Sequence, residues 1–141
     1  METGAFSWTD SAVSCDCCGK SVQVYYDGPF YSAENINYLC PECISNGKAA
    51  LKYDGEFQDE CSLEEGVDSE EKLDELIHRT PGYSGWQQEY WRTHCNDYCA
   101  FIGYVGYREL KHMKLVDEIL EDPVLNQQYA EPEELLKTAV N

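Results

Sequence analysis

Two short cysteine motifs, Cys15-Asp-Cys-Cys-Gly-Lys20 and Cys40-Pro-Glu-Cys43, decide how the first part of this chain folds. The two-residue spacing in each motif lets one turn aim both sulfur atoms at a single ion, and two such turns supply the tetrahedral four-sulfur shell that zinc prefers. Because four sulfurs close the shell, no position remains for a catalytic water. We therefore predict one structural zinc ion held by Cys15, Cys18, Cys40 and Cys43.

Two other readings of these cysteines compete with zinc. A Cys-x-x-Cys pair can be a dithiol redox site, and cysteines can also pack as small buried apolar residues. Two pairs that close one hairpin favour a shared metal over both. Cys17 lacks the two-residue spacing to its neighbours, so we expect it to remain unliganded. Cys61 lies in an acidic stretch with no basic group nearby, so we do not expect a reactive thiol there.

The residues around the motifs predict a β-hairpin followed by a short helix. Apolar and polar residues alternate over 21–26, which is typical of a strand, and 30–33 is its expected return strand after the turn at Asp27-Gly28-Pro29. Pro41 suits the first turn of a helix. Residues 1–14 are expected to form an extended lead-in.

The rest of the chain predicts helices and loops. We expect an acidic loop over 54–68 and a helix over 69–79, where Asp68 and Glu71 resemble a capping pair. Further expectations are a helix opened by a Ser84–Gln87 capping box, a turn at Asn96-Asp97, a helix from Leu110 to Leu120 and a terminal helix over 132–140. The predicted fold class is α+β: a small zinc-ribbon-like β-hairpin module (1–53) packed on a mixed, helix-rich body (54–141), the two forming one unit.

A second group of chemically capable residues is found at His94, Cys95, Asp97 and Cys99. These cysteines could build a second metal site with His112 or Cys61, and His94 with Cys95 could form a catalytic pair. Adjacent residues in an extended segment point apart, however. We therefore favour core packing for Cys95 and Cys99.

The charge of the chain narrows the classes of partner. There are 27 Asp and Glu against 10 Lys and Arg, for a formal net charge of −17. A surface this negative repels nucleic acid and anionic lipid and attracts basic proteins. No apolar run is long enough to span a membrane, and the chain starts without a signal peptide, so we expect cytoplasmic residence and reduced thiols.

The acidic residues gather in a segment where we predict a partner-binding surface. Asp54 to Glu75 holds eleven acids and one Lys. The partner would be a basic protein, steered by charge and held by aromatic anchors. The predicted acids are Asp54, Glu56, Asp59, Glu60, Glu64 and Glu65, and the predicted anchors are Tyr53, Phe57, Tyr83 and Trp86.

Several motifs together resemble the bacterial CbrC family. They are Cys15-x-x-Cys18-Gly19, Cys40-Pro41-x-Cys43-Ile44, Thr80-Pro-Gly-Tyr-Ser-Gly-Trp-Gln87, Trp91-x-x-His94-Cys95-x-Asp97 and Phe101-x-Gly103. This chain differs from that family in carrying Glu42 where relatives often have Trp. The resemblance implies the four zinc cysteines and a role in tolerance to colicins, which are bacterial toxins.

These observations favour a binding protein over an enzyme or an adaptor. The leading hypothesis is an immunity or tolerance protein that neutralises a bacterial toxin by binding its basic domain directly. A secreted toxin with a nuclease domain is an example of such a partner. The alternatives are a small enzyme using Cys95, His94 or Asp97, and a zinc-ribbon adaptor of an unassigned pathway. No nucleophile elbow or phosphate-binding loop supports the enzyme, and the charge opposes a nucleic-acid adaptor.

Overall fold

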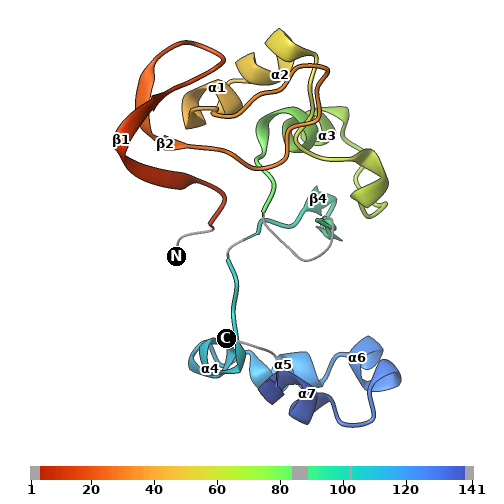
Figure 1. Cartoon of the computed structure of the whole chain (residues 1–141). Coiled ribbons are helices and arrows are strands. Elements are labelled where there is room, and N and C mark those ends of the chain that lie inside the picture. The colour runs from red at the N-terminus through yellow and green to blue at the C-terminus, as the bar shows by residue number, and fades with distance from the viewer. Residues whose placement is uncertain (1–3, 84–88, 102, 139–141) are drawn as a thin grey trace. The chain divides into compact units, whose positions relative to one another are not determined.

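The chain contains both helices and short antiparallel strands, which confirms the predicted α+β class. The computed structural model describes residues 4–83, 89–101 and 103–138. The chain divides into two units, Met1–Ile102 and Gly103–Asn141 (Figure 1). The module boundary predicted after residue 53 lies inside the first of these units.

The first cysteine motif connects the two strands of a hairpin. Strand β1 (Ser7–Ser14) pairs antiparallel with β2 (Ser21–Tyr25), with Ser14 opposite Ser21. The motif turns the chain because Gly19 adopts a left-handed φ of 72° and donates its N–H to the Cys15 carbonyl at 2.7 Å. The predicted strand over 21–26 is thus confirmed.

The predicted pairing of that strand is wrong. Its partner is β1, which we expected only as an extended lead-in, and not residues 30–33. Tyr31 instead exchanges backbone hydrogen bonds with Glu56, at 2.8 and 2.9 Å. The turn within the cysteine motif places Ser7–Ser14 beside β2. Because β2 is paired with β1 there, the segment after Pro29 pairs with the acidic segment instead.

Within its described residues, the frame of the first unit is completed by three α-helices: α1 (Pro41–Ser45), α2 (Lys48–Tyr53) and α3 (Glu70–Arg79). In α3, Leu76 and Ile77 are buried, as the apolar stripe predicts. The N-cap of α3 is Ser69, whose hydroxyl accepts the N–H of Lys72 at 3.4 Å, so the predicted capping pair is one residue early.

The core of the first unit is largely aromatic. Tyr26 and Phe57 are 2% and 1% exposed and meet edge to face with ring centroids 5.6 Å apart. Phe30 packs against Phe57 at 4.7 Å. Tyr26 donates its hydroxyl to the Pro29 carbonyl at 2.8 Å, which gives this buried polar group the partner it needs.

The segment 54–68 is the acidic loop we predicted, apart from one 3₁₀ turn, and backbone hydrogen bonds hold it in place. Phe57 donates its N–H to the Ile77 carbonyl at 2.8 Å, and Glu64 and Trp91 are joined by a backbone bond of 2.9 Å. A single 3₁₀ turn, η1 (Glu60–Ser62), begins at Asp59, which caps it. Backbone hydrogen bonds to α3 and to Trp91 therefore fix this segment on the frame. The Phe57 side chain holds it as well, because it is buried in the core.

A second hairpin follows Trp91. Strand β3 (Thr93–His94) pairs with β4 (Asp97–Tyr98), and Cys95 and Asn96 between them have φ of 54° and 57°. Two successive left-handed residues are typical of a type I′ turn. The turn is therefore centred one residue earlier than predicted. The Ser84–Gln87 capping box lies outside the described residues.

Over residues 103–138, the part of the second unit that the structure describes, there are four short helices: α4 (Tyr107–His112), α5 (Val116–Leu120), α6 (Pro123–Gln128) and α7 (Pro132–Thr138). The helix predicted from Leu110 to Leu120 is interrupted because Lys114 has a left-handed φ of 60°. The terminal helix begins at Pro132 as predicted. Among the residues that the structure describes, no helix combines the length and apolar character needed to cross a membrane.

The burial of Phe57 gives a direct test of this fold. Phe57→Ala should lower the free energy of unfolding by about 3–5 kcal/mol, because it leaves a cavity in the aromatic core. Leu51→Ala is the matched control, since Leu51 is 88% exposed, and its effect should stay within about 0.5 kcal/mol. Urea denaturation of both variants measures the difference. Equal effects would contradict the packing described here.

Candidate metal centre

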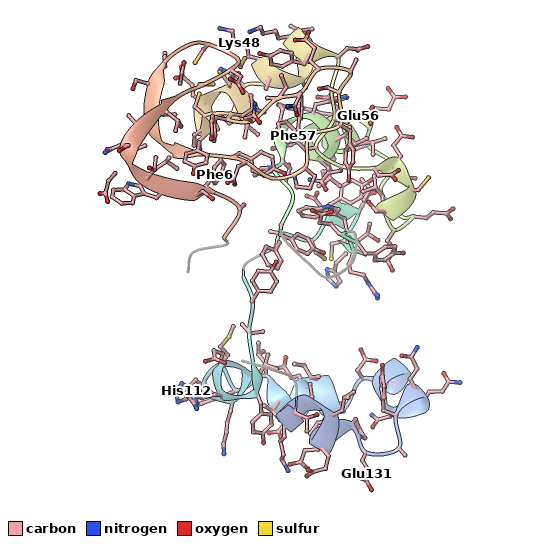
Figure 2. All side chains as sticks on the ribbon, viewed as in Figure 1. Phe6, Lys48, Glu56, Phe57, His112 and Glu131 are labelled. Atoms are coloured by element: carbon pink, nitrogen blue, oxygen red, sulfur yellow. The ribbon has the colours of Figure 1, made fainter. Side chains whose placement is uncertain are left out.

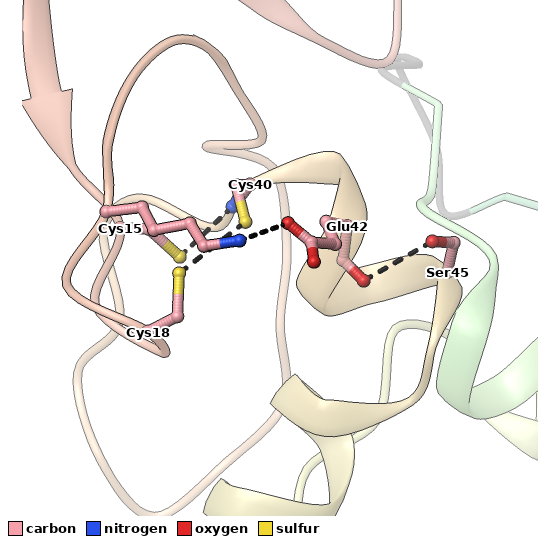
Figure 3. A network of polar contacts seen from close by, with 6 residues as sticks. Cys15, Cys18, Cys40, Glu42 and Ser45 are labelled. Atoms are coloured by element: carbon pink, nitrogen blue, oxygen red, sulfur yellow. Dashed lines mark hydrogen bonds and ion pairs between the residues drawn. The ribbon is translucent and has the colours of Figure 1, made fainter.

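Four cysteine thiols converge in the first unit, and they are the four that the motif spacing predicts. The Sγ atoms of Cys15, Cys18, Cys40 and Cys43 all lie within 4.8 Å of one another. The Cys18 and Cys40 sulfurs are 3.9 Å apart (Figure 3). A tetrahedral zinc site with Zn–S bonds of about 2.3 Å has sulfur–sulfur edges of about 3.8 Å. The geometry is therefore that of a site able to hold one metal ion.

Two different local structures present the two pairs. Cys15 and Cys18 lie in the turn between β1 and β2, whereas Cys40 and Cys43 lie at the start of α1. The second pair therefore comes from a helical turn opened by Pro41, where the N–H of Cys43 donates to the Cys40 carbonyl at 3.0 Å. The Cys40 N–H donates to the Cys15 sulfur at 3.3 Å and so links the two pairs.

The environment of the thiols favours a bound cation. Cys15, Cys40 and Cys43 are buried, and burial raises the pKa of the Cys40 and Cys43 thiols. The backbone N–H of Lys20 lowers the pKa of the partly exposed Cys18 thiol to about 7. Buried thiolates need positive charge nearby, and a divalent metal ion supplies it.

An ion pair crosses the rim of the centre. Lys20, in the first motif, contacts Glu42, in the second, with Nζ and Oε2 2.6 Å apart (Figure 3). Glu42 raises the pKa of Lys20, and Lys20 lowers that of Glu42. Both side chains are more than half exposed. The pair therefore contributes little to stability, because solvent screens it.

The other cysteines stand apart from this centre. Cys17 is buried in the core and is not one of the four convergent thiols. Cys61, Cys95 and Cys99 are exposed, so our expectation that Cys95 and Cys99 pack in the core is wrong. Cys95 lies in the turn of the β3–β4 hairpin, and Cys99 directly follows β4. The described residues 4–83, 89–101 and 103–138 contain no second cluster with metal-binding geometry.

The residues of the alternative enzyme do not assemble into a catalytic group. Cys95 lies at the turn of the hairpin and His94 ends β3, and both are exposed. Asp97 forms an ion pair with Lys72 at 2.9 Å, and this ammonium lowers the pKa of the carboxyl group. Its role in the structure is to tie β4 to α3.

The predicted partner residues divide between the surface and the core. Tyr53 and Phe57 are buried, so neither can anchor a partner; Figure 2 shows Phe57 and the exposed Glu56. Tyr83 is half-buried and stacks on Phe101 at 4.1 Å, while Trp86 lies outside the described residues. The predicted acids are exposed at Asp54, Glu56, Glu60 and Glu65 and half-buried at Asp59 and Glu64.

Sequence reasoning missed two groups of residues. One adjoins the metal centre: Lys52 Nζ donates to the Asp16 carbonyl at 3.0 Å, and the Asp16 carboxylate accepts the N–H of Asn37 at 2.8 Å. The other consists of His78 and Arg79, which line a cavity of about 520 Å³ between the α1–α2 junction and α3 together with the predicted Asp54 and Glu56. No local pattern marks either group, because each forms only when distant segments meet.

Comparison with known proteins identifies one family. A family model described as an uncharacterised protein family (UPF0167) matches residues 1–141. A UPF0167 protein of Pseudomonas aeruginosa is 41% identical over 102 residues, which cover 71% of this chain and 57% of that protein. UPF0167 proteins of Mycobacterium bovis and Mycobacterium tuberculosis are each 39% identical over 108 residues, covering 76% of this chain and 58% of theirs. No solved structure matches.

These findings overturn the resemblance to the CbrC family. The matching family and relatives are UPF0167 proteins, and their descriptions assign no activity. The colicin-tolerance role that the resemblance implied therefore loses that support. The chain also spans only 57–58% of the length of these curated relatives.

The geometry predicts that Cys95 and Cys99 are dispensable for metal. Changing both to Ala should leave the metal content per chain unchanged and shift the free energy of unfolding by no more than about 0.5 kcal/mol, because both side chains are exposed. Elemental analysis and urea denaturation give the two readouts. A loss of one metal equivalent in this variant would reveal a second site.

Proposed function

We propose, for a chain that belongs to the uncharacterised protein family UPF0167, a role as a binding protein that one structural zinc ion stabilises and whose acidic surface receives a basic protein. In this proposal the zinc ion stabilises the fold, and the acidic surface binds the partner. The two parts of the proposal rest on different observations and are tested separately.

Zinc is the metal that the donor set supports best. Four thiolates form a soft, closed shell, which zinc accepts in tetrahedral geometry and which leaves no site for a substrate. With the first pair on a β-hairpin, the module is zinc-ribbon-like, although the second pair comes from α1. Thiols that serve as ligands must stay reduced, which supports a cytoplasmic location.

The observation that carries the binding role is the cavity beside α3. Three carboxylates, those of Asp54, Glu56 and Asp74, line it together with His78 and Arg79. Asp74 is already paired: its Oδ1 lies 2.8 Å from His78 Nδ1, and its Oδ2 lies 3.3 Å from Arg79 Nη2. Asp54 and Glu56 form no salt bridge within the described part of the chain. They are therefore available to a positively charged group.

The rim of this cavity offers an apolar contact beside the charges. Leu51 is 88% exposed and lines the cavity from α2. A lysine or arginine side chain combines an apolar stem with a charged head, and such a group fits a site with Leu51 at the rim and carboxylates around it. We infer that the partner places a basic side chain here.

Further carboxylates extend the acidic surface beyond the cavity. They are exposed and, within residues 4–83, 89–101 and 103–138, form no salt bridge: Glu60, Glu65, Asp68, Glu70, Glu71 and Glu75. Their field speeds the encounter with a basic protein and disfavours nucleic acid and anionic membranes. A basic toxin domain is one partner with the positive charge that this surface attracts. With such a partner, the protein would act as an immunity protein.

Zinc binding and folding should be linked. Purified protein should contain close to one zinc ion per chain, and Cys40→Ser should lose both the ion and the folded state, because zinc binding energy is folding energy in such sites. Cys61→Ser, which changes an exposed thiol, is the matched control and should keep both. Elemental analysis with circular dichroism measures the outcome. A stably folded, metal-free Cys40→Ser protein would sink the structural role of zinc.

The acidic surface should control the rate of partner binding. A photo-crosslinking residue at position 51 captures the partner in the native cell, and mass spectrometry identifies it. Association rates are then measured over a range of salt concentrations. The triple variant Asp54→Asn, Glu56→Gln, Glu60→Gln should bind several-fold more slowly at low salt than the unmodified protein, with the difference shrinking as salt screens the charges.

The control variant changes net charge equally at another place. Asp117→Asn, Glu118→Gln, Glu121→Gln removes three exposed acids from the second unit. Its association rate should stay near that of the unmodified protein. Equal slowing by both triple variants would mean that net charge alone acts, and no slowing by either would remove the acidic surface from the binding site.

A further inference from the structure

Asp16 lies inside the first cysteine motif and connects it to a distant segment. Its carboxylate Oδ2 accepts the backbone N–H of Asn37 at 2.8 Å and that of Tyr38 at 3.0 Å. Its own N–H donates to the Tyr38 carbonyl at 2.9 Å. The side-chain bonds span 21 and 22 positions in the sequence. They are therefore tertiary bonds and not part of the local turn.

The segment that Asp16 holds leads directly into the second cysteine motif. Leu39 separates Tyr38 from Cys40, and Leu39 is itself paired with Tyr26 through two backbone bonds of 2.8 and 3.0 Å. Cys40 then donates its N–H to the Cys15 sulfur at 3.3 Å. The hydrogen bonds to Asp16 therefore help to fix the position of the second cysteine pair relative to the first pair.

The backbone of the same residue is held from the other side by α2. The Asp16 carbonyl accepts the Tyr53 hydroxyl at 2.6 Å and Lys52 Nζ at 3.0 Å. Lys52 also donates to the Cys17 carbonyl at 2.9 Å. Four thiolates and one Zn²⁺ carry a formal charge of about −2, so an ammonium group beside the motif is favourable.

We propose that Asp16 is a positioning residue for the metal centre. Its carboxylate keeps the two cysteine motifs at the separation that closes a four-sulfur shell and thereby slows metal release. The inference rests on the proposed zinc site. The physical cause is preorganisation, because groups that orient metal ligands through hydrogen bonds typically raise metal affinity about 10–100-fold.

The charge of Asp16 also acts on the centre, so the test must separate it from the hydrogen bonds. The carboxylate repels the thiolates and attracts the Zn²⁺ ion, and these two effects on metal release oppose each other. Removing its hydrogen bonds should accelerate release. Asp16→Ala removes both the charge and the bonds, whereas Asp16→Asn removes the charge and keeps an oxygen that can accept both N–H groups.

The experiment measures zinc release from the full-length protein into excess chelator under native conditions. Asp16→Ala should release zinc about 10–100-fold faster than the unmodified protein, and Asp16→Asn should release it no faster. Asp10→Ala removes an exposed acid from β1 as a control for charge. Ile77→Val weakens the core of α3 as a control for general stability, since Ile77 is 3% exposed. Both controls should release zinc at the unmodified rate.

The outcomes separate this inference from the proposed function. If the unmodified protein holds no zinc, the zinc site and this inference both fail. If it holds zinc and Asp16→Ala releases it at the unmodified rate or more slowly, only the role of Asp16 fails. Release by Asp16→Asn as fast as by Asp16→Ala, or equal acceleration by Ile77→Val, also overturns that role. If Asp16→Ala does not fold while Asp16→Asn behaves like the unmodified protein, the hydrogen bonds are the essential feature and the inference stands.

Discussion

The convergence of four thiols is the constraint on which the first unit depends. Three of these thiols are buried, and a buried thiolate is unfavourable without a nearby positive charge. A metal ion bound in the centre would remove that penalty and would at the same time join the β1–β2 hairpin to α1. Because α1 leads into α2, and α2 contacts the Asp16 carbonyl, one centre connects most of the elements around the aromatic core.

The acidic segment shows how one stretch of chain serves two purposes. Neighbouring residues face opposite ways: Phe57 is buried in the core, whereas Glu56 is exposed (Figure 2). Backbone bonds to Tyr31, to Ile77 and to Trp91 fix the segment. Like charges repel one another, and this frame offsets the repulsion. The result is an acidic surface held by backbone hydrogen bonds, and in the binding role proposed above such a surface would lose less entropy than a solvated loop.

Local patterns predicted those parts of the structure that are set by near neighbours. The Cys-x-x-Cys spacing identified the four convergent thiols, since a turn of a few residues fixes the direction of both sulfurs. Alternation over 21–26 predicted β2, and the apolar stripe predicted α3. Errors of one residue at Ser69 and at the Cys95-Asn96 turn arise because capping and turn residues are chemically similar, and several neighbouring positions satisfy the same pattern.

The sequence by itself determined the four thiols that converge, the strand and helix that follow them, and the excess of negative charge, because each depends on residue type or on spacing within a few positions. Only the tertiary structure decided that β1 pairs with β2, that Tyr53 and Phe57 are core residues, and that Cys95 and Cys99 are exposed. It also decided that Asp16 meets Asn37 and Tyr38. These features depend on which distant segments come together, and that choice is made by the packing of the whole unit around its core and its four thiols.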